Sequence, residues 1–203
     1  MLTPQTATHA NEDPSSDEAL MLAFAKGNAA AFEALYDRHE RGAWRFVFRS
    51  VKNQEVADDV SQELWFAVAR SAASYVPTAK FKTWLFTMAR NRVIDLSRTA
   101  KHHASIDEEN DEGQSMFSDL AADSRLGPLR QVSSREQASA LLQAIEELPA
   151  DQRETFLLQA EGDMSVEEIA AATGVSFETA KSRLRYARNK LKSLLADFAE
   201  VTA

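Results

Sequence analysis

The sequence predicts an all-α protein in which two small helical domains are joined by a flexible acidic linker. Apolar residues recur at helical spacing along most of the chain, and no stretch alternates strictly between apolar and polar residues as a half-buried strand does. The 203 residues include 6 Gly and 5 Pro, a low number that favours long helices over a turn-rich β architecture. A polar, acidic stretch divides the helical pattern into two parts.

The first helical domain is predicted over residues 17–100, after an acidic polar tail over residues 1–16. Its first helix is expected to begin at Asp17, and a series of apolar stripes predicts further helices up to the end of the domain. Eleven of the 17 aromatic residues of the chain lie between Phe32 and Phe86. This domain is therefore expected to have a core of its own.

The second helical domain is predicted over residues 134–203, beyond an acidic linker over residues 101–133. Ser165 and Glu168 have the spacing of a capping box, in which each side chain accepts a hydrogen bond from the backbone of the other residue. The helix that follows this capped one is expected to bury one apolar face, made of Ala180, Leu184, Ala187, Leu191 and Leu195.

Composition and motifs exclude several classes of function. The chain has no cysteine, which rules out disulfides, a cysteine nucleophile, iron–sulfur clusters and cysteine-based zinc sites. It has no glycine-rich phosphate loop, nucleophile elbow or His-Glu-x-x-His pair, so we expect no enzyme, no cofactor, no metal and no small-molecule substrate. No apolar run approaches the roughly 20 residues of a membrane span, and no signal peptide is recognised. A cytoplasmic location is therefore expected.

Charge is segregated along the chain, although the total is −8. Basic residues far outnumber acidic ones in residues 80–103 and again in residues 177–192, whereas residues 105–124 contain acidic residues and no base. Because a local basic segment attracts nucleic acid whatever the total charge, the acidic sum does not exclude DNA binding.

The best-defined motif is a helix-turn-helix centred on Gly174. This glycine supplies the left-handed conformation of a tight turn, and the small Ala170 and Ala180 let the two helices approach closely. A basic stripe follows on the second helix and consists of Lys181, Arg185, Arg188 and Lys192. A solvated charged face is the alternative interpretation of the stripe alone, but together with the turn it favours a recognition helix that binds DNA.

Two further surfaces are expected in the first domain. Bases and aromatic residues are interleaved in residues 80–103, where Trp84 is expected either in the core or as a platform for an unpaired base. One face of an earlier helix carries Asp59, Gln62, Glu63 and Phe66. This acidic face is either simply solvated or a docking surface for a basic protein, with Trp65 or Phe66 as an exposed apolar anchor.

Four segments, taken together, resemble the bacterial sigma factors. In chain order they read ADDVSQELWFAV, FKTWLFTMARNRVID, LPADQRETFLL and SVEEIAAATGVSFETAKSRLRYARNKL. The chain is similar in particular to the small extracytoplasmic-function (ECF, group four) class of the sigma-70 family, over residues 17–100 and 134–195. The resemblance implies a factor that binds core RNA polymerase and directs promoter-specific initiation, with region two in the first domain and region four in the second.

The resemblance also implies roles for individual residues. The set expected to dock on the clamp helices of the largest polymerase subunit is Asp58, Asp59, Val60, Gln62, Glu63 and Phe66. The set expected to recognise and melt the minus-ten element is Lys80, Lys82, Trp84, Arg90, Asn91, Arg92 and Arg98, beside a loop over residues 73–79 that captures a flipped base. The set expected to read the minus-thirty-five element is Ser176, Glu178, Thr179, Lys181, Ser182, Arg183, Arg185 and Arg188.

The family further implies partners beyond promoter DNA and the clamp. Region four is expected to meet the polymerase flap, the linker is expected to thread near the polymerase active centre, and an anti-sigma factor, often membrane-bound, is expected to control the chain in a stress or envelope response. The sequence departs from the family at Ala180, where valine is more frequent, and in the loop over residues 73–79, which is less polar than usual. The alternative function is an autonomous helix-turn-helix regulator, which would need a dimer surface and a palindromic site.

Overall fold

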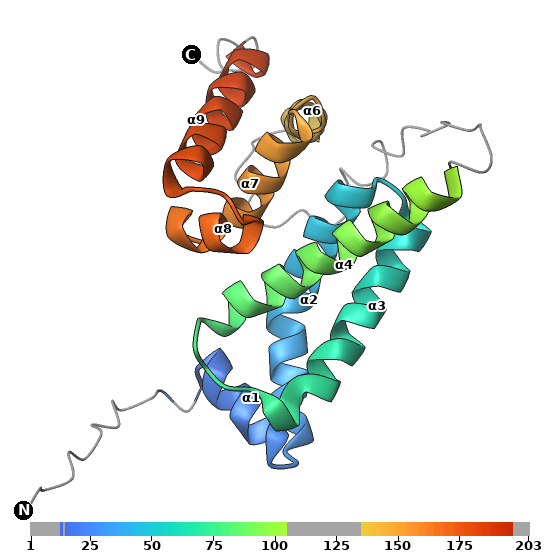
Figure 1. Ribbon diagram of the computed structural model, residues 1–203, viewed down its shortest axis with the longest axis vertical. Helices are drawn as coiled ribbons and strands as arrows, with labels where there is room; N and C mark the ends of the chain where they lie inside the picture. Colours follow the sequence, from blue (N-terminus) through green and yellow to red (C-terminus); the bar gives the residue numbers. More distant parts are fainter. Residues whose placement is uncertain (1–12, 14, 105–134, 197–203) are drawn as a thin grey trace, which may run out of the picture.

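The computed structural model describes residues 13, 15–104 and 135–196, and within these residues all regular structure is helical (Figure 1). The elements are α1 (Asp17–Ala25), α2 (Ala29–Val51), α3 (Gln54–Ser71), the 3-10 turn η1 (Ala72–Ser74), α4 (Phe81–Ala104), α6 (Arg135–Glu146), α7 (Ala150–Ala160), α8 (Val166–Thr173) and α9 (Phe177–Leu194). The predicted all-α class is confirmed. The predictions for the acidic linker concern residues 105–133, which lie outside the described part of the chain.

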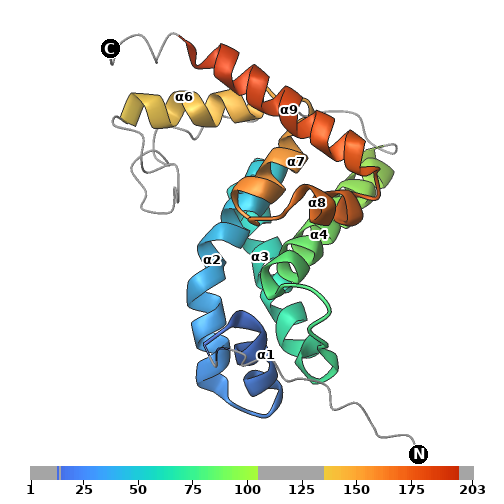
Figure 2. The same ribbon diagram turned by 90° about the vertical axis from the view of Figure 1, so that its left-hand side faces the viewer.

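In the first helical unit, α2, α3 and α4 pack along one another and α1 lies across one end (Figures 1 and 2). The first three helices begin with side-chain caps, because the oxygens of Ser16, Asn28 and Asn53 each accept from the backbone N–H three residues later. The Glu18 carboxylate accepts a hydrogen bond of 2.6 Å from the Phe81 N–H and so fixes the start of α4 against α1. The fully buried core side chains of this unit include Leu35, Phe46, Leu64, Val68 and Leu85.

The second unit, α6 to α9, matches the local signals of the sequence. The capping box is present at the start of α8, where the Glu168 carboxylate accepts from the Ser165 N–H at 2.7 Å and the Ser165 hydroxyl accepts from the Glu168 N–H at 3.2 Å. Gly174 has φ +70° and ends α8, and Ser176 caps α9. The buried face of α9 consists of Ala180, Leu184, Ala187 and Leu191, with Leu195 partly buried.

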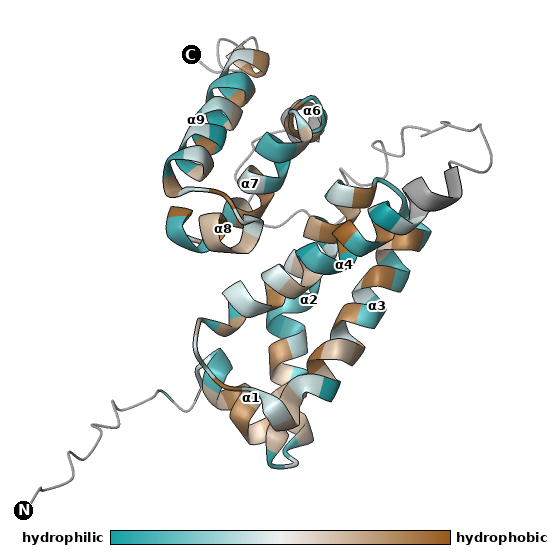
Figure 3. Ribbon diagram, viewed as in Figure 1, coloured by the Kyte–Doolittle hydropathy of each residue, from teal (hydrophilic) through white to brown (hydrophobic). Residues whose placement is uncertain are grey.

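Hydrophilic and hydrophobic residues share most helices, as expected where one face is buried (Figure 3). The core of the first unit nevertheless continues into that of the second. One hydrophobic cluster contains Phe86 of α4 together with Leu158 and Met164 of the second unit. Gly162 permits this approach, because a Cβ added there would lie 3.1 Å from Phe86 Cγ. In addition, α4 continues to Ala104, beyond the predicted domain boundary.

Candidate protein and nucleic-acid interfaces

The predicted acidic face lies on the outer side of α3. Asp59, Gln62 and Glu63 are exposed there together with Phe66, which is 57% exposed. Val60 is buried, so it supports the face from the core and does not reach solvent. Carboxylates around one exposed aromatic ring suit a basic protein surface with an apolar centre.

Trp65 turns inward from this face, whereas Asp58 is exposed but is engaged by α2. Trp65 is 6% exposed, and its ring packs on Tyr36 at a centroid distance of 4.9 Å, so Phe66 and not Trp65 is available as an apolar anchor. The Asp58 carboxylate accepts a hydrogen bond of 2.7 Å from Trp44 Nε1. Asp58 therefore links α3 to α2 and, being exposed, remains a predicted member of the docking set.

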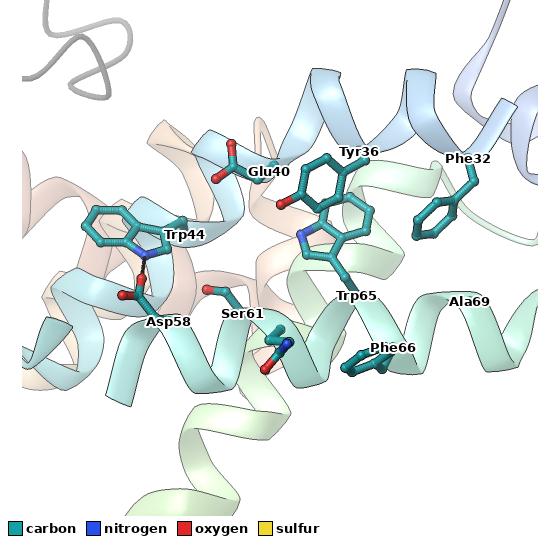
Figure 4. Close-up of a pocket in the computed structure, with 10 residues that line it drawn as sticks. Phe32, Tyr36, Glu40, Trp44, Asp58, Ser61, Trp65, Phe66 and Ala69 are labelled. Atoms are coloured by element: carbon teal, nitrogen blue, oxygen red, sulfur yellow. Dashed lines mark hydrogen bonds between the residues drawn. The ribbon is translucent and has the colours of Figure 1, made fainter. Parts of the chain in front are cut away.

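A groove of about 450 Å³ runs between α2 and α3 beside the acidic face (Figure 4). Its aromatic wall continues the apolar surface of Phe66, and the Glu40 carboxylate adds a further negative group. Ser61 Oγ and Trp65 Nε1 are buried next to it and have no hydrogen-bond partner among the described residues. The lining residues are Phe32, Tyr36, Glu40, Trp44, Asp58, Ser61, Gln62, Trp65, Phe66 and Ala69.

The basic side chains of α4 are engaged to different degrees. Arg92 pairs with Glu63 at 3.1 Å and Arg98 pairs with Asp95 at 3.7 Å. Water reaches all four of these side chains, so neither pair is a strong obstacle to phosphate binding. The remaining members of the minus-ten set on this surface are the exposed Lys80 and Asn91 and the partly buried Lys82.

Arg90 differs from these residues because the second helical unit engages it. Its Nε donates to the Glu154 carboxylate at 2.9 Å, and its Nη1 donates to the Ala172 carbonyl at 2.9 Å. The Arg90 side chain is 15% exposed. In this arrangement the predicted minus-ten set is therefore split, with Arg90 held under α7 and α8.

Trp84 belongs to an aromatic cluster next to the predicted base-capturing loop. Its ring lies 5.3 Å from that of Tyr75 and 5.7 Å from that of Phe81, and it is partly buried. Of the two interpretations of Trp84, the structure favours packing that supports the loop, on which Val76 is 66% exposed. The Tyr75 hydroxyl is buried without a hydrogen-bond partner among the described residues, and burial above all raises the pKa of Tyr75 to about 12.

The recognition helix α9 presents its N-terminal half to solvent. The exposed members of the predicted set are Ser176, Glu178, Thr179, Lys181, Arg185 and Arg188, and Ser182 and Arg183 are partly buried. Lys181 Nζ lies 5.6 Å from the centre of the Phe177 ring, and the Arg185 guanidinium lies 5.0 Å from that of Tyr186. Cations held on exposed rings form a surface suited to phosphates and base edges.

Two arginines of the predicted set are tied to α7. Arg183 pairs with the Asp151 carboxylate, and Arg188 Nη2 donates to Gln159 Oε1 at 2.5 Å. Asp151 is 65% exposed and Arg188 is exposed, so these surface contacts are weak and leave both arginines able to reach phosphates. Sequence spacing alone placed both arginines with the DNA-contacting residues.

Sequence reasoning missed the polar residues at which the two units meet. Glu161, at the end of α7, is paired with Arg45 and Arg49 of α2, and all three are buried. Burial lowers the pKa of Arg49, and the charge of Glu161 opposes this effect. Thr83 Oγ1 donates to the Glu168 carboxylate at 2.7 Å across the same boundary. No motif or periodicity marks these residues, because each helix taken alone gives them no partner.

Comparison with known proteins identifies both units. The family model of sigma-70 region 2 matches residues 35–103, and that of sigma-70 region 4 matches residues 138–191. The chain is 31% identical over 184 residues to the RNA polymerase sigma factor NccH of Alcaligenes xylosoxydans xylosoxydans, covering 90% of this chain and 96% of that protein. It is 30% identical over 174 residues to the ECF RNA polymerase sigma factor SigW of Bacillus subtilis (strain 168), covering 85% and 92%.

A solved structure has the same fold. It contains the sigma factor RpoE in complex with the anti-sigma factor NepR from Bartonella quintana, and it matches with a TM-score of 0.62 and 22% identity over 81% of this chain and 96% of that one. The two family models and the two relatives thus define a transcription initiation factor with two helical modules. The chain belongs to the sigma-70 family of RNA polymerase sigma factors, in its extracytoplasmic-function group. Within the described residues, no helix is long and apolar enough to cross a membrane.

Replacing Tyr75 by Phe tests the buried, unpartnered hydroxyl near the loop. The hydroxyl loses its water on folding and gains no partner, so Tyr75→Phe should not lower the free energy of unfolding at neutral pH by more than ~0.5 kcal/mol. Because folding raises the pKa of Tyr75 from 10.0 to about 12, the wild type should lose stability as the pH rises through this interval, and Tyr75→Phe should lose less.

Urea unfolding, followed by circular dichroism at neutral pH and at about pH 11, measures both the stability at neutral pH and its loss at high pH. Tyr186→Phe, at a position that is 53% exposed, is the matched control and should keep the wild-type pH dependence. An unchanged pH dependence in Tyr75→Phe would contradict the placement of this hydroxyl.

Proposed function

We propose that this sigma factor binds core RNA polymerase through the outer face of α3. The single observation that carries this proposal is the grouping of exposed Asp59, Gln62 and Glu63 around exposed Phe66, beside an aromatic groove. The clamp helices of the largest polymerase subunit are the expected partner. Asp58 is exposed at the edge of this face, where Trp44 holds its carboxylate, and the buried Val60 supports the face through packing.

We further propose that α4 and the loop before it bind the minus-ten element. Exposed cations along α4 can follow the phosphates, while the loop over residues 73–79 receives an extruded base. Extrusion costs a few kcal/mol, which contacts to the captured base must offset. Trp84 and Tyr75 contribute by holding the loop in place, since their rings pack on each other.

The minus-thirty-five element is the proposed ligand of α9. In a helix-turn-helix the N-terminal residues of the second helix meet base edges in the major groove. Glu178, Thr179 and Ser182 are placed for this role, and Lys181 and Arg185 for phosphates. Arg183 and Arg188 add cations to this surface, and each also contacts a polar side chain of α7.

The chain acts in this proposal by binding and not by catalysis, in the cytoplasm where polymerase and promoter are found. We also propose control by an anti-sigma factor, which can hold the chain at the inner membrane where that partner is membrane-bound. The solved complex of RpoE with NepR supports this proposal, because that sigma factor has the same fold.

Charge reversal on α3 tests the polymerase-docking face. The double variant Asp59→Arg, Glu63→Arg should weaken binding to purified core polymerase at least about tenfold, or about 1.4 kcal/mol, because it places cations against a basic partner. The helix should remain intact, since both side chains are exposed. Binding is measured by titrating labelled full-length chain with core polymerase.

The double variant Glu33→Arg, Asp37→Arg is the matched control for this experiment. It makes the same charge change at the same spacing, on exposed positions of α2 that do not line the groove. If both variants lost binding equally, the loss would be explained by the change in total charge and not by the α3 face. If the α3 variant bound core polymerase as the wild type does, the α3 face would not be the docking surface.

Substitution of Lys181 and Arg185 tests the recognition helix. If each neutralises one phosphate, the double alanine variant should bind promoter DNA more weakly, and the slope of log affinity against log salt should fall in magnitude by about 1.8. Fluorescence anisotropy of the full-length chain on a minus-thirty-five duplex measures the slope. Lys190→Ala, also exposed on α9 but outside the predicted set, should leave it unchanged. An unaltered slope in the double variant would exclude phosphate contacts by these two residues.

A further inference from the structure

We propose that the groove between α2 and α3 binds a small organic cation, in which an ammonium group is carried on an apolar body. Residues of both helices line this groove (Figure 4), and its volume of about 450 Å³ is typical of small-molecule sites in proteins. The site itself is formed by this chain alone. Its consequence for polymerase rests on the proposed function of the α3 face.

Aromatic rings form most of the groove wall. The Trp65 ring of α3 packs between two rings of α2, at centroid distances of 5.9 Å from Phe32 and 4.9 Å from Tyr36. Tyr36 and Phe66 are exposed, so the wall is open to solvent at its rim. Because the face of an aromatic ring carries partial negative charge, such a wall attracts cations as well as apolar groups.

Two carboxylates give the groove a negative charge that no lining residue balances. Glu40 comes from α2 and Asp58 from α3, and the lining residues contain no lysine, arginine or histidine. Within the described part of the chain neither carboxylate is paired with a cation, although Asp58 accepts the hydrogen bond from Trp44. A carboxylate beside apolar rings attracts a cation more strongly than a carboxylate in open water does. The ligand of this groove is therefore expected to carry a positive charge.

The negative field of the groove acts on Tyr36. Burial raises the pKa of the Tyr36 hydroxyl, and the charges of Glu40 and Asp37 raise it further. Figure 4 shows the Glu40 carboxylate beside this hydroxyl. The same field that disfavours a tyrosinate favours a cation at this position.

Two buried polar atoms next to the groove indicate a polar group in the ligand. Ser61 Oγ and Trp65 Nε1 have no hydrogen-bond partner among the described residues, and the two residues are 9% and 6% exposed. A buried donor or acceptor without a partner costs free energy, which an entering group recovers when it supplies the missing bond. By displacing the exposed Tyr36 ring, a ligand can donate from its ammonium group to Ser61 Oγ and accept from Trp65 Nε1 through a neighbouring oxygen.

A cation in the groove would also affect the proposed polymerase contact. Asp58, Gln62 and Phe66 line the groove and belong to the predicted docking set as well. A bound cation neutralises charge at Asp58 and covers apolar surface at Phe66, so it should weaken binding of core polymerase. The groove is then a place at which a small amine lowers the amount of active factor.

The three tryptophans of the chain allow a direct test by NMR. Trp44 and Trp65 line the groove, whereas Trp84 does not. The probe is 2-phenoxyethylamine, which has an aromatic body, an ether oxygen and an amine that is protonated at neutral pH. In the nitrogen-15-labelled full-length chain, it should shift the indole N–H signals of Trp44 and Trp65 and leave that of Trp84 in place. For so small a probe, a dissociation constant on the order of 1 mM is expected.

Two further probes and two variants test the role of charge. Neutral 2-phenoxyethanol and negatively charged phenoxyacetate have nearly the same body and should bind at least about tenfold more weakly than the amine. Glu40→Gln should weaken binding of the amine about fivefold, whereas Glu33→Gln, at an exposed position of α2 outside the groove, should not. Helix content measured by circular dichroism must match the wild type in both variants.

Two results would overturn the site. Equal binding of the amine and the alcohol would show an apolar contact without selectivity for a cation. Unchanged Trp44 and Trp65 signals at about 10 mM amine would show that the groove holds only water.

Competition with core polymerase is the second measurement. Saturating amine should weaken binding of the labelled full-length chain to core polymerase, and this effect should be smaller in Glu40→Gln. Binding of polymerase that the amine leaves unchanged, in a chain whose Trp65 signal shifts, would overturn the effect on docking. The NMR measurement requires no polymerase, so failure of the proposed docking face would leave the result for the ligand site unchanged.

Discussion

The ionic cluster of Glu161 with Arg45 and Arg49 fixes the relation between the two halves of this molecule. A carboxylate that is 2% exposed is tolerated when its charge is matched and its oxygens accept hydrogen bonds, and α2 supplies both. Glu161 is followed by Gly162, whose lack of a side chain lets Phe86 approach. The turn between α7 and α8 is thereby held against the first unit. This contact determines where the recognition helix α9 lies relative to the α3 face.

This arrangement divides the functional surfaces into accessible and covered ones. The α3 face and the N-terminal half of α9 are exposed, whereas Arg90 on α4 lies beneath α7 and α8. Two weak DNA-binding modules on one chain gain from their high effective concentration once both can reach the promoter. A net charge of −8 lowers the attraction of the whole chain to random DNA. Specific binding to the promoter then depends on polymerase, because the factor meets both promoter elements together when it is bound to polymerase.

The sequence predicted the local structure well because the signals are local. Ser165 and Glu168 are three residues apart, and Gly174 must adopt a left-handed conformation wherever the unit is placed. Residues whose role depends on a distant partner were not predictable in this way. Nothing in the sequence singled out Arg45, and the hydrogen bond from Trp44 to Asp58 of the acidic helix was equally unforeseen. Burial of Trp65 rather than Phe66 was likewise decided by the packing of α2 against α3. The roles in DNA and polymerase binding came from the family resemblance, and they remain predictions.

Run-off transcription with purified core RNA polymerase and a promoter library, with and without this chain, tests the central claim most directly. The account predicts specific transcripts that appear with the chain, are lost with the Asp59→Arg, Glu63→Arg variant and share upstream sequences at the minus-ten and minus-thirty-five positions. Transcription that the chain leaves unchanged across the library, together with no binding of the chain to core polymerase, would contradict it.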